Sequence, residues 1–413
     1  MKVRIATLFS IVLLFLASLG HSQRPTPTPK RLTVLENDAE LRELYLNINQ
    51  KCIGRLSSEM WTLTHAYESK KEADEVLDYF MNFFKAIASD DSKQIAQLKR
   101  AKGFKDSFSK FLDSKDEAVR SFSLLMLGCA GDKSYAPKIA KLVNERDRSF
   151  NDRFAGKPTF ARGRAAQALG ALQASEYKQD IAKLLKSQND SDRSGAISAL
   201  AEMKALEFTS EIVALMTNKD LAFDDDDSPI YFLIETKQAE KYKKEIVQAM
   251  LDESHEKVPE SAAYALAAIG AKEHAKDIAQ LLKDEFRQGD AAKALAMLGA
   301  TEYADEIAQL LAAKSGLTRN SALISLAILN SSKHVPAMIG LYRNDPEIYV
   351  KPHAAEALLL MGFPQFYREI VGGKPEPNEP PTLLEMDFHY FVREKLGLLN
   401  DRLKSNLQAK KPS

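Results

Sequence analysis

The chain has 413 residues, of which 57 are basic and 57 are acidic, so its formal net charge is zero. A dedicated nucleic-acid-binding protein is usually basic overall or along one stripe, and this balance argues against that class of partner. A hydrophobic fraction of 45% and a charged fraction of 28% are ordinary for a folded soluble protein.

Residues 1–22 have the pattern of a targeting segment. Lys2 and Arg4 precede an apolar run from Ile5 to Leu19, and the small residues Gly20–Ser22 follow it. This order is typical of a cleaved secretory signal, and the run is shorter than the roughly 20 residues that span a bilayer. We therefore expect an exported protein, periplasmic or extracellular, with no transmembrane segment after signal cleavage.

The next part of the chain divides into a linker and a helical block. Residues 23–32 are rich in Pro and Thr, which favours an extended, unpacked backbone. Residues 33–90 have helical periodicity without a repeat, for example Val76, Phe80 and Phe84 on one helix face. We predict that this block is an N-terminal helical cap, which covers the open end of the helical array beside it.

Residues 91–373 contain an internal repeat. An apolar cluster such as Ile-Ala-Lys-Leu-Leu returns nine times at a step of about 31 residues, and a single step is longer, at about 42 residues. The first residues of the nine clusters are Phe108, Ile139, Ile181, Ile212, Ile246, Ile278, Ile307, Met338 and the weaker Ile370. A period in this range is typical of a solenoid of stacked helix pairs, with the clusters buried between repeats. Leu281 and Leu310 are predicted core residues on this basis.

Each repeat is predicted to contain two helices. The first helix carries a stripe of small residues, and Gly170 and Gly299 are expected to supply its left-handed C-cap. The second helix carries the apolar cluster. Solenoids present an extended concave surface, which we expect the second helices to line.

The opening Asp116-Glu-Ala-Val-Arg120 of one repeat resembles the HEAT repeat, in particular the short HEAT-like type found in phycobilin lyases. The resemblance implies an all-α fold: an α-solenoid superhelix of about nine HEAT-like helix pairs with N- and C-terminal helical caps. Nineteen positions before successive clusters stand Arg120, Arg162, Arg193, Asp227, Pro259, Gln288, Arg319 and Lys351. We interpret this largely basic register as a packing ladder between repeats, with a ligand-facing ladder as the alternative.

Residues 374–413 contain a Pro-rich break, a predicted helix from Leu383 to Leu403 and a tail. The apolar residues of the helix follow helical spacing, so we predict that it docks as a C-terminal cap. An autonomous partner-binding helix is the alternative.

Two local features leave alternatives open. Export permits a disulfide between Cys52 and Cys129, but the geometry it needs is narrow, and we favour two unpaired cysteines. The acidic run Asp224–Asp227 suggests calcium, yet the spacing of a 12-residue calcium loop is absent. We favour its interpretation as the N-terminal turn of a helix, where acids are stabilising.

No motif with a catalytic mechanism is present in the sequence. It lacks the Gly-rich phosphate-binding motifs and the nucleophile elbow, and its seven His residues have no metal-ligand spacing. We therefore predict no catalytic, cofactor-binding or metal-binding residues, no cofactor and no enzymatic activity.

Two surfaces are candidates for binding another protein. The longest step, from Ile139 to Ile181, contains an insertion whose Arg and Phe side chains are typical interface anchors. The candidate residues there are Arg146, Arg148, Phe150, Arg153 and Phe154. On the second helices, Lys110, Lys141 and Lys183 share an exposed register and give the first repeats a basic face. The alternatives are a loop that packs its aromatics on the solenoid and a face that is merely solvated.

The sequence thus predicts a secreted or periplasmic helical-repeat scaffold that mediates protein–protein interaction without catalysis. The first alternative, implied by the resemblance, is a HEAT-like lyase-type enzyme or enzyme subunit. The second alternative is a purely structural envelope protein.

Overall fold

The computed structural model describes residues 33–51, 60, 63, 70–144, 161–216, 218, 229–252, 258–370, 403, 405 and 406. Every regular element within these ranges is a helix. The chain divides into two compact units, which are considered separately below. Unit 1 comprises residues 1–212 and 226–235, and unit 2 comprises residues 213–225 and 236–413.

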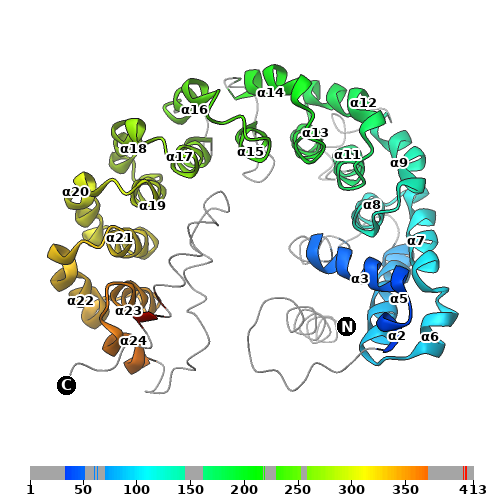
Figure 1. Ribbon diagram of the computed structural model, residues 1–413, viewed down its shortest axis with the longest axis horizontal. Coiled ribbons are helices and arrows are strands. Elements are labelled where there is room, and N and C mark those ends of the chain that lie inside the picture. The colour runs from blue at the N-terminus through cyan, green and yellow to red at the C-terminus, as the bar shows by residue number, and fades with distance from the viewer. Residues whose placement is uncertain are drawn as a thin grey trace. The chain divides into compact units, whose positions relative to one another are not determined.

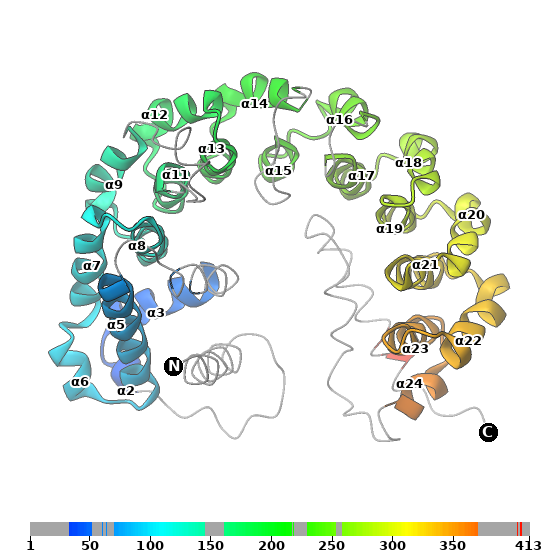
Figure 2. The same ribbon diagram turned by 180° about the vertical axis from the view of Figure 1, so that it is seen from behind.

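Unit 1 combines an N-terminal helical block with stacked helix pairs (Figures 1 and 2). The N-terminal helices are α2 (Thr33–Glu36), α3 (Ala39–Lys51), α5 (Lys70–Ala88) and α6 (Ser92–Gln97). The first helices of the pairs are α8 (Glu117–Ala130), α11 (Ala161–Ala171), α13 (Asp190–Glu202) and α15 (Pro229–Glu235). The second helices are α7 (Arg100–Lys110), α9 (Ala136–Val143), α12 (Lys178–Lys183) and α14 (Thr209–Leu215), which extends past the unit boundary.

Unit 2 continues the same alternation. Its first helices are α17 (Val258–Ile269), α19 (Gln288–Leu298), α21 (Gly316–Ile328) and α23 (Val350–Leu360). Its second helices are α16 (Lys243–Met250), α18 (Ala275–Gln280), α20 (Ala304–Gln309), α22 (Val335–Asn344) and α24 (Pro364–Ile370). The first helices pack on one another in sequence order, α17 on α19, α19 on α21 and α21 on α23. The chain is therefore an α-solenoid of HEAT-like helix pairs, as the sequence predicts.

The two kinds of helix form two layers in each unit taken by itself, and the first helices lie on the inner side of the curve (Figure 1). The expectation that the second helices line the concave side is wrong. Small residues explain the arrangement, because they let the first helices approach closely on the tighter side of the stack. A Cβ on Gly170 of α11 would stand 2.7 Å from Cα of Ala199 in α13.

The apolar clusters form the core between repeats. The first residue of each of the first eight clusters is buried, and so are the predicted core residues Leu281 and Leu310. The ninth position is the exception, since the side chain of Ile370 is 39% exposed. It lies at the end of α24, and no further helix pair follows it within the described residues.

A left-handed residue between the two helices of each pair recurs with the repeat. The positions are Gly131, Gln173, Lys204, Lys237, Gly270, Gly299, Asn330 and Gly362, with φ between 51° and 90°. The predicted role of Gly299 is confirmed, whereas that of Gly170 is wrong. In that repeat the helix continues past Gly170, and Gln173 adopts the left-handed conformation instead.

The basic register forms a packing ladder, which confirms the favoured interpretation. Three guanidinium groups donate to the backbone carbonyl six residues earlier: Arg120 to Ser114, Arg193 to Ser187 and Arg319 to Ala313. Two members of the register also reach the following repeat, where Arg162 lies 3.4 Å from Asp192 and Arg319 lies 2.7 Å from Asp345. These contacts satisfy backbone carbonyls and connect neighbouring repeats.

The N-terminal block packs on α7 and α8, the first two helices of the array, through aromatic rings. The ring centroid of Phe83 in α5 lies 4.6 Å from that of Phe104 in α7, and Phe80 lies 5.5 Å from Phe122 in α8. All four side chains are fully buried. This contact closes the apolar end of the first pair, which a solenoid must do to remain soluble. The domain boundaries drawn from the sequence stay predictions.

At the other end, a short C-terminal segment contacts α23. Leu403 is fully buried, and the Asn406 side-chain amide donates to the carbonyls of Leu359 and Leu360 at 2.9 and 3.0 Å. These carbonyls belong to the last turn of α23, where side chains often supplement the backbone hydrogen bonds of a helix end. The rest of the predicted capping helix, from residue 383, lies outside the described residues.

The expectation of unpaired cysteines is wrong, because Cys129 is disulfide-bonded. The sequence holds one other cysteine, Cys52, which lies outside the described residues. Cys52 follows α3 directly in the sequence, and α3 packs on α8, the helix that carries Cys129. Separation along the chain therefore gave no measure of their distance in the fold. The acidic run at residues 224–227 also lies outside the described residues.

Candidate functional site

The predicted lysine face lies in the second-helix layer of unit 1. Lys110, Lys141 and Lys183 are all exposed, and they belong to α7, α9 and α12. The ammonium group of Lys183 lies 2.6 Å from the carboxylate of Asp180, and its hydrogen bond lowers the pKa of that carboxyl. The lysines are thus available on the outer layer, and one already has an acidic partner.

The predicted anchors of the insertion are not placed by the structure. Arg146, Arg148, Phe150, Arg153 and Phe154 lie outside the described residues.

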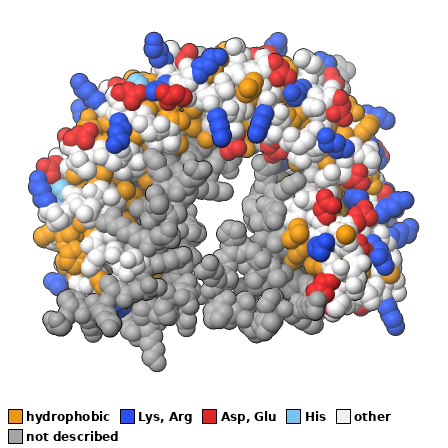
Figure 3. All heavy atoms as spheres, in the orientation of Figure 1, with side chains coloured by type: hydrophobic (Ala, Val, Ile, Leu, Met, Phe, Trp, Pro, Cys, Tyr) orange, Lys and Arg blue, Asp and Glu red, His pale blue; other side chains and the backbone are white. Residues whose placement is uncertain are grey.

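Charged side chains of both signs are interspersed on the face that Figure 3 shows. Ion pairs between neighbouring repeats explain part of this pattern, for example Lys178 with Glu207 at 3.2 Å and Lys243 with Glu273 at 2.6 Å. The members of each pair lie about one repeat apart in sequence. Among the described residues on this face, charges of the two signs therefore alternate.

No cluster of potential metal ligands is present among the described residues. Three histidines fall in these ranges. Two contact a group three or four residues away, and the third contacts a carboxylate of the preceding repeat. Nδ1 of His274 lies 2.8 Å from Asp277, Nε2 of His334 lies 3.1 Å from Asp305, and Nδ1 of His353 lies 2.8 Å from the Tyr349 carbonyl. The described helices also include none long and apolar enough to cross a membrane.

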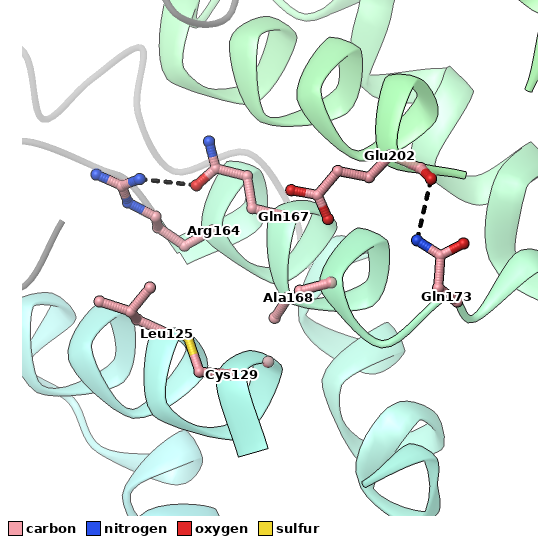
Figure 4. A pocket seen from close by; sticks show the side chains of 9 residues that line it. Leu125, Cys129, Arg164, Gln167, Ala168, Gln173 and Glu202 are labelled. Carbon is pink, nitrogen blue, oxygen red and sulfur yellow. Dashed lines mark hydrogen bonds between the residues drawn. The ribbon is translucent and has the colours of Figure 1, made fainter. Parts of the chain in front are cut away.

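A cavity of about 410 Å³ opens on the first-helix layer of unit 1 (Figure 4). Its floor is the contact between α8 and α11, where a Cβ on Gly128 would lie 3.0 Å from Cα of Ala168. The polar side chains around it are Arg164, Gln167, Gln173 and Glu202. This volume falls within the range of small-molecule sites.

Both charge signs are present in this cavity. Arg164 donates to the side-chain carbonyl of Gln167 at 2.7 Å, and the carboxylate of Glu202 extends toward the cavity from α13 (Figure 4). The Gln173 amide donates to the carbonyls of Gly170 and Glu202 at 3.0 Å each. Cys129 also lines the cavity, but its sulfur is in a disulfide and offers no thiolate. The arrangement can hold a polar ligand, and the described residues that line it include no nucleophile–base pair.

Unit 2 carries a different feature, a periodic row of exposed apolar side chains. Phe286, Leu317 and Ile348 are 89%, 69% and 89% exposed. Successive members lie about one repeat apart in sequence. Phe286 and Leu317 stand two residues before Gln288 and Arg319 of the largely basic register, and Ile348 stands three residues before Lys351. We call these three residues the apolar row. Single exposed apolar residues are ordinary, whereas contiguous exposed apolar patches are typical of interaction sites.

The backbone at the apolar row is held by its own hydrogen bonds. The Phe286 N–H donates to the carboxylate of Asp284 at 2.9 Å, and the Glu347 N–H donates to Asp345 at 2.9 Å. The N–H of Thr318 donates to Ser315 at 3.5 Å, where α21 begins. Phe286 and Ile348 therefore stand just before α19 and α23, and Leu317 lies in the first turn of α21, all on an ordered backbone.

The described positions of this register in unit 1 carry small side chains. The equivalent positions there are Ala118 and Ser191, both partly buried at the start of α8 and α13. The apolar row escaped prediction because the buried clusters alone defined the repeats.

Neither a protein-family model nor a curated protein matches the sequence. One matching solved structure is the complex of CpcE and CpcF of phycocyanin lyase from Nostoc sp. PCC7120. It shares 16% sequence identity, its match covers 72% of this chain and 94% of that chain, and the TM-score is 0.30.

This match corrects one prediction. From the sequence we expected no enzymatic activity, and the matching structure is that of a lyase, so the prediction is contradicted and we withdraw it. The reason for the error is that the residues of the repeat motif are structural, so an absence of catalytic motifs among them says nothing of activity. At 16% identity the match assigns neither a reaction nor a substrate to this chain.

Proposed function

We propose that the protein is a helical-repeat scaffold that binds another protein through the apolar row of unit 2. The observation that carries the proposal is the recurrence of large exposed apolar side chains at Phe286, Leu317 and Ile348. Exposing such side chains brings no benefit to folding, and two described repeats of unit 1 have Ala118 and Ser191 near this position instead. Aromatic and aliphatic anchors are what a protein interface buries.

The test is a triple variant, Phe286→Ser with Leu317→Ser and Ile348→Ser, in a pull-down from an extract of the cells that make the protein. We expect a stoichiometric partner of the unaltered chain to be lost. The matched control is Leu206→Ser, because Leu206 is 47% exposed in unit 1 and lies outside the row. Retention of the partner by the triple variant would contradict the proposal.

The insertion of unit 1 remains a proposed second contact. Its Arg and Phe side chains support it, since such residues commonly anchor interfaces. Changing Phe150, Arg153 and Phe154 together to Ala should weaken the same complex if both units contact one partner. An unchanged affinity would remove the insertion from the binding surface.

We also propose export to an oxidising compartment. Support comes from the signal-like residues 1–22 and from the disulfide at Cys129, since disulfides persist mainly outside the cytosol. Fractionation of the producing cells should place the protein outside the cytoplasm, with a mature N-terminus near Gln23. A cytoplasmic protein that retains residues 1–22 would contradict this proposal.

A second candidate function is that of an enzyme or enzyme subunit. The observation that favours it is the polar cavity of unit 1, which brings Arg164, Gln167 and Glu202 around one space. Turnover of a small molecule by the purified chain, abolished by Glu202→Gln and kept in the apolar-row variant, would support it. Activity that Glu202→Gln leaves unchanged would exclude this cavity as the site.

A further inference from the structure

We infer that the cavity of unit 1 binds a small zwitterion, a molecule that carries an ammonium group and a carboxylate on an apolar body. Amino acids with large apolar side chains and dipeptides share this chemistry. The inference goes beyond the scaffold proposal, because it concerns the other unit and uses no residue of the apolar row. It also names a ligand class for the cavity of the second candidate function, and it requires no turnover.

The first step is the reason for the open space. Ala171 stands two residues before Gln173, the left-handed residue of its repeat. The equivalent places in α19, α21 and α23, each two residues before a left-handed residue, hold Met297, Ile328 and Leu360. The single methyl group of Ala171 therefore leaves room that a larger side chain in this register would fill.

The second step is the size of the space and its apolar surface. The lining includes Leu125 and Cys129 of α8 and Ala168 and Ala171 of α11, whose side chains offer apolar surface. A water occupies about 30 Å³ in the liquid, so about 410 Å³ has room for about fourteen groups of that size. This room suits an amino acid with a large apolar side chain or a dipeptide.

The third step is the site for the carboxylate. Arg164 and Gln167 lie about one turn apart on α11, and the guanidinium donates to the Gln167 side-chain carbonyl at 2.7 Å. Gln167 is only 8% exposed, so this hydrogen bond holds the guanidinium at the wall of the cavity (Figure 4). A guanidinium has five donors in a planar fork that matches a carboxylate. Arg164 is therefore the anchor for the carboxylate of the ligand.

The fourth step is the site for the ammonium. Glu202 is the last residue of α13, and its carboxylate extends toward the cavity (Figure 4). The C-terminal end of a helix carries partial negative charge, so the helix dipole and the carboxylate both attract a cation there. The Gln173 amide donates to the carbonyls of Gly170 and Glu202 at 3.0 Å each, which connects the ends of α11 and α13 beside this site.

The two anchors come from neighbouring helices whose packing is close. A Cβ on Gly170 of α11 would stand 2.7 Å from Cα of Ala199, which lies about one turn before Glu202 in α13. One cavity thus presents a guanidinium and a carboxylate. A ligand with a single charge would complement only one of them, whereas a zwitterion complements both.

Isothermal titration calorimetry of the mature full-length protein tests this inference. The probes are L-phenylalanine, L-leucine and the dipeptide alanyl-leucine, and we expect these free zwitterions to bind. N-acetylphenylalanine lacks the ammonium, and phenylalanine amide lacks the carboxylate. Each should bind about tenfold more weakly than L-phenylalanine, because one charged hydrogen bond is lost.

Two variants assign the two charges of the ligand. Glu202→Gln should weaken binding of L-phenylalanine about tenfold and leave binding of N-acetylphenylalanine unchanged. Arg164→Met should weaken binding of L-phenylalanine by a similar factor and leave binding of phenylalanine amide unchanged. The matched control is Glu176→Gln, which removes an exposed carboxylate outside the cavity lining and should not change the affinity.

A third variant fills the cavity without a change of charge. Ala171→Leu introduces the residue that α23 has in this register, so the midpoint of thermal unfolding should stay the same. Binding of all three zwitterions should be lost. Unchanged affinity in this variant would overturn the cavity as the site.

The remaining outcomes concern the ligand class. Binding of the dipeptide alone would support the zwitterion and make a short peptide its source. Absence of binding by all three zwitterions, or blocked ligands that bind as tightly as L-phenylalanine, would overturn the inference. Neither result affects the scaffold proposal, which the pull-down with the apolar-row variant tests separately.

Discussion

The two units solve the same packing problem with different contacts. In unit 1, the first helices meet through glycine, and a Cβ on Gly195 of α13 would stand 2.5 Å from Cα of Gly163 in α11. In unit 2, α21 and the start of α23 are connected by the buried ion pair of Arg319 and Asp345, with two distances of 2.7 Å. Unit 1 thus brings backbone against backbone at this contact, in addition to its Arg162–Asp192 contact, whereas unit 2 has the shorter, two-pronged ion pair of Arg319 with Asp345.

The surfaces of the two units also differ. Unit 1 has a polar cavity on its first-helix layer, and unit 2 has the apolar row at the start of its first helices. Both units keep the same buried clusters and the same left-handed turn positions. The difference teaches that the repeat constrains the core and the turns, whereas register positions at the helix starts are free to serve binding.

The largest effect is expected from the polar connection of unit 2. Asp345→Ala should lower the free energy of unfolding by about 4 kcal/mol, because it leaves the buried Arg319 guanidinium without its carboxylate. Chemical unfolding monitored by circular dichroism measures this loss. The control Asp305→Ala removes an exposed carboxylate that pairs with Lys333, and it should cost less than about 1 kcal/mol. Similar losses for both variants would contradict the special role of Asp345.

The Asp345 contribution should also depend on pH. Burial would raise the pKa of this carboxyl, but hydrogen bonds from Arg319 and the Glu347 N–H, with the Arg319 charge, outweigh burial and hold the pKa below 3.8. A depressed folded-state pKa means that the stabilisation is complete above the unfolded pKa of about 4 and is lost as the pH falls through the folded value. The stability gap between wild type and Asp345→Ala should therefore shrink below about pH 4. A gap that stays constant from neutral to strongly acidic pH would contradict the ion pair.

An equal effect in both units is expected at the core position that they share. Leu184 in unit 1 and Leu310 in unit 2 occupy the same place in the apolar cluster, and both are buried. Replacing either with Ala should cost about 3 kcal/mol through lost burial and the cavity left behind. Urea unfolding of the two variants checks this, and a difference above about 2 kcal/mol would show that the units do not share one core register.

Adding one methyl group should lower the free energy of unfolding at a position of unit 1 and raise it at a position of unit 2. Gly195→Ala should cost about 2 kcal/mol, because the new Cβ meets the backbone of Gly163. Gly340→Ala in α22 is the matched control, since nothing lies within 4 Å of its Cβ position, and it should stabilise by about 0.5 kcal/mol. Thermal unfolding detects both changes, and a neutral Gly195→Ala would mean that α11 and α13 can separate at no cost.

The smallest effect on stability is expected at the apolar row. Phe286→Ser should change the free energy of unfolding by less than about 0.5 kcal/mol, because an exposed side chain contributes little to folding. Chemical unfolding measures it alongside the binding assay. A loss of about 2 kcal/mol or more would show that this residue is part of the fold and not of a binding surface.

Much of the fold could be predicted from the sequence alone. The regular return of the apolar clusters and the helical spacing within each cluster predict stacked helix pairs, because a helix must bury its apolar face against the neighbouring repeat. The same logic correctly placed Leu281 and Leu310 in the core and interpreted the basic register as packing. These inferences depend on the spacing of apolar and basic residues along the chain, which can be read from the sequence.

Other features depended on distances that only the tertiary structure supplies. Gly170 looked like a helix end, yet it serves close packing on Ala199, and Cys129 forms a disulfide that sequence separation did not suggest. The polar cavity unites residues from α8, α11 and α13, and the exposure of Phe286 depends on which side of a turn remains uncovered. The physical reason is that burial and proximity are properties of packed repeats, and one repeat in isolation does not contain them.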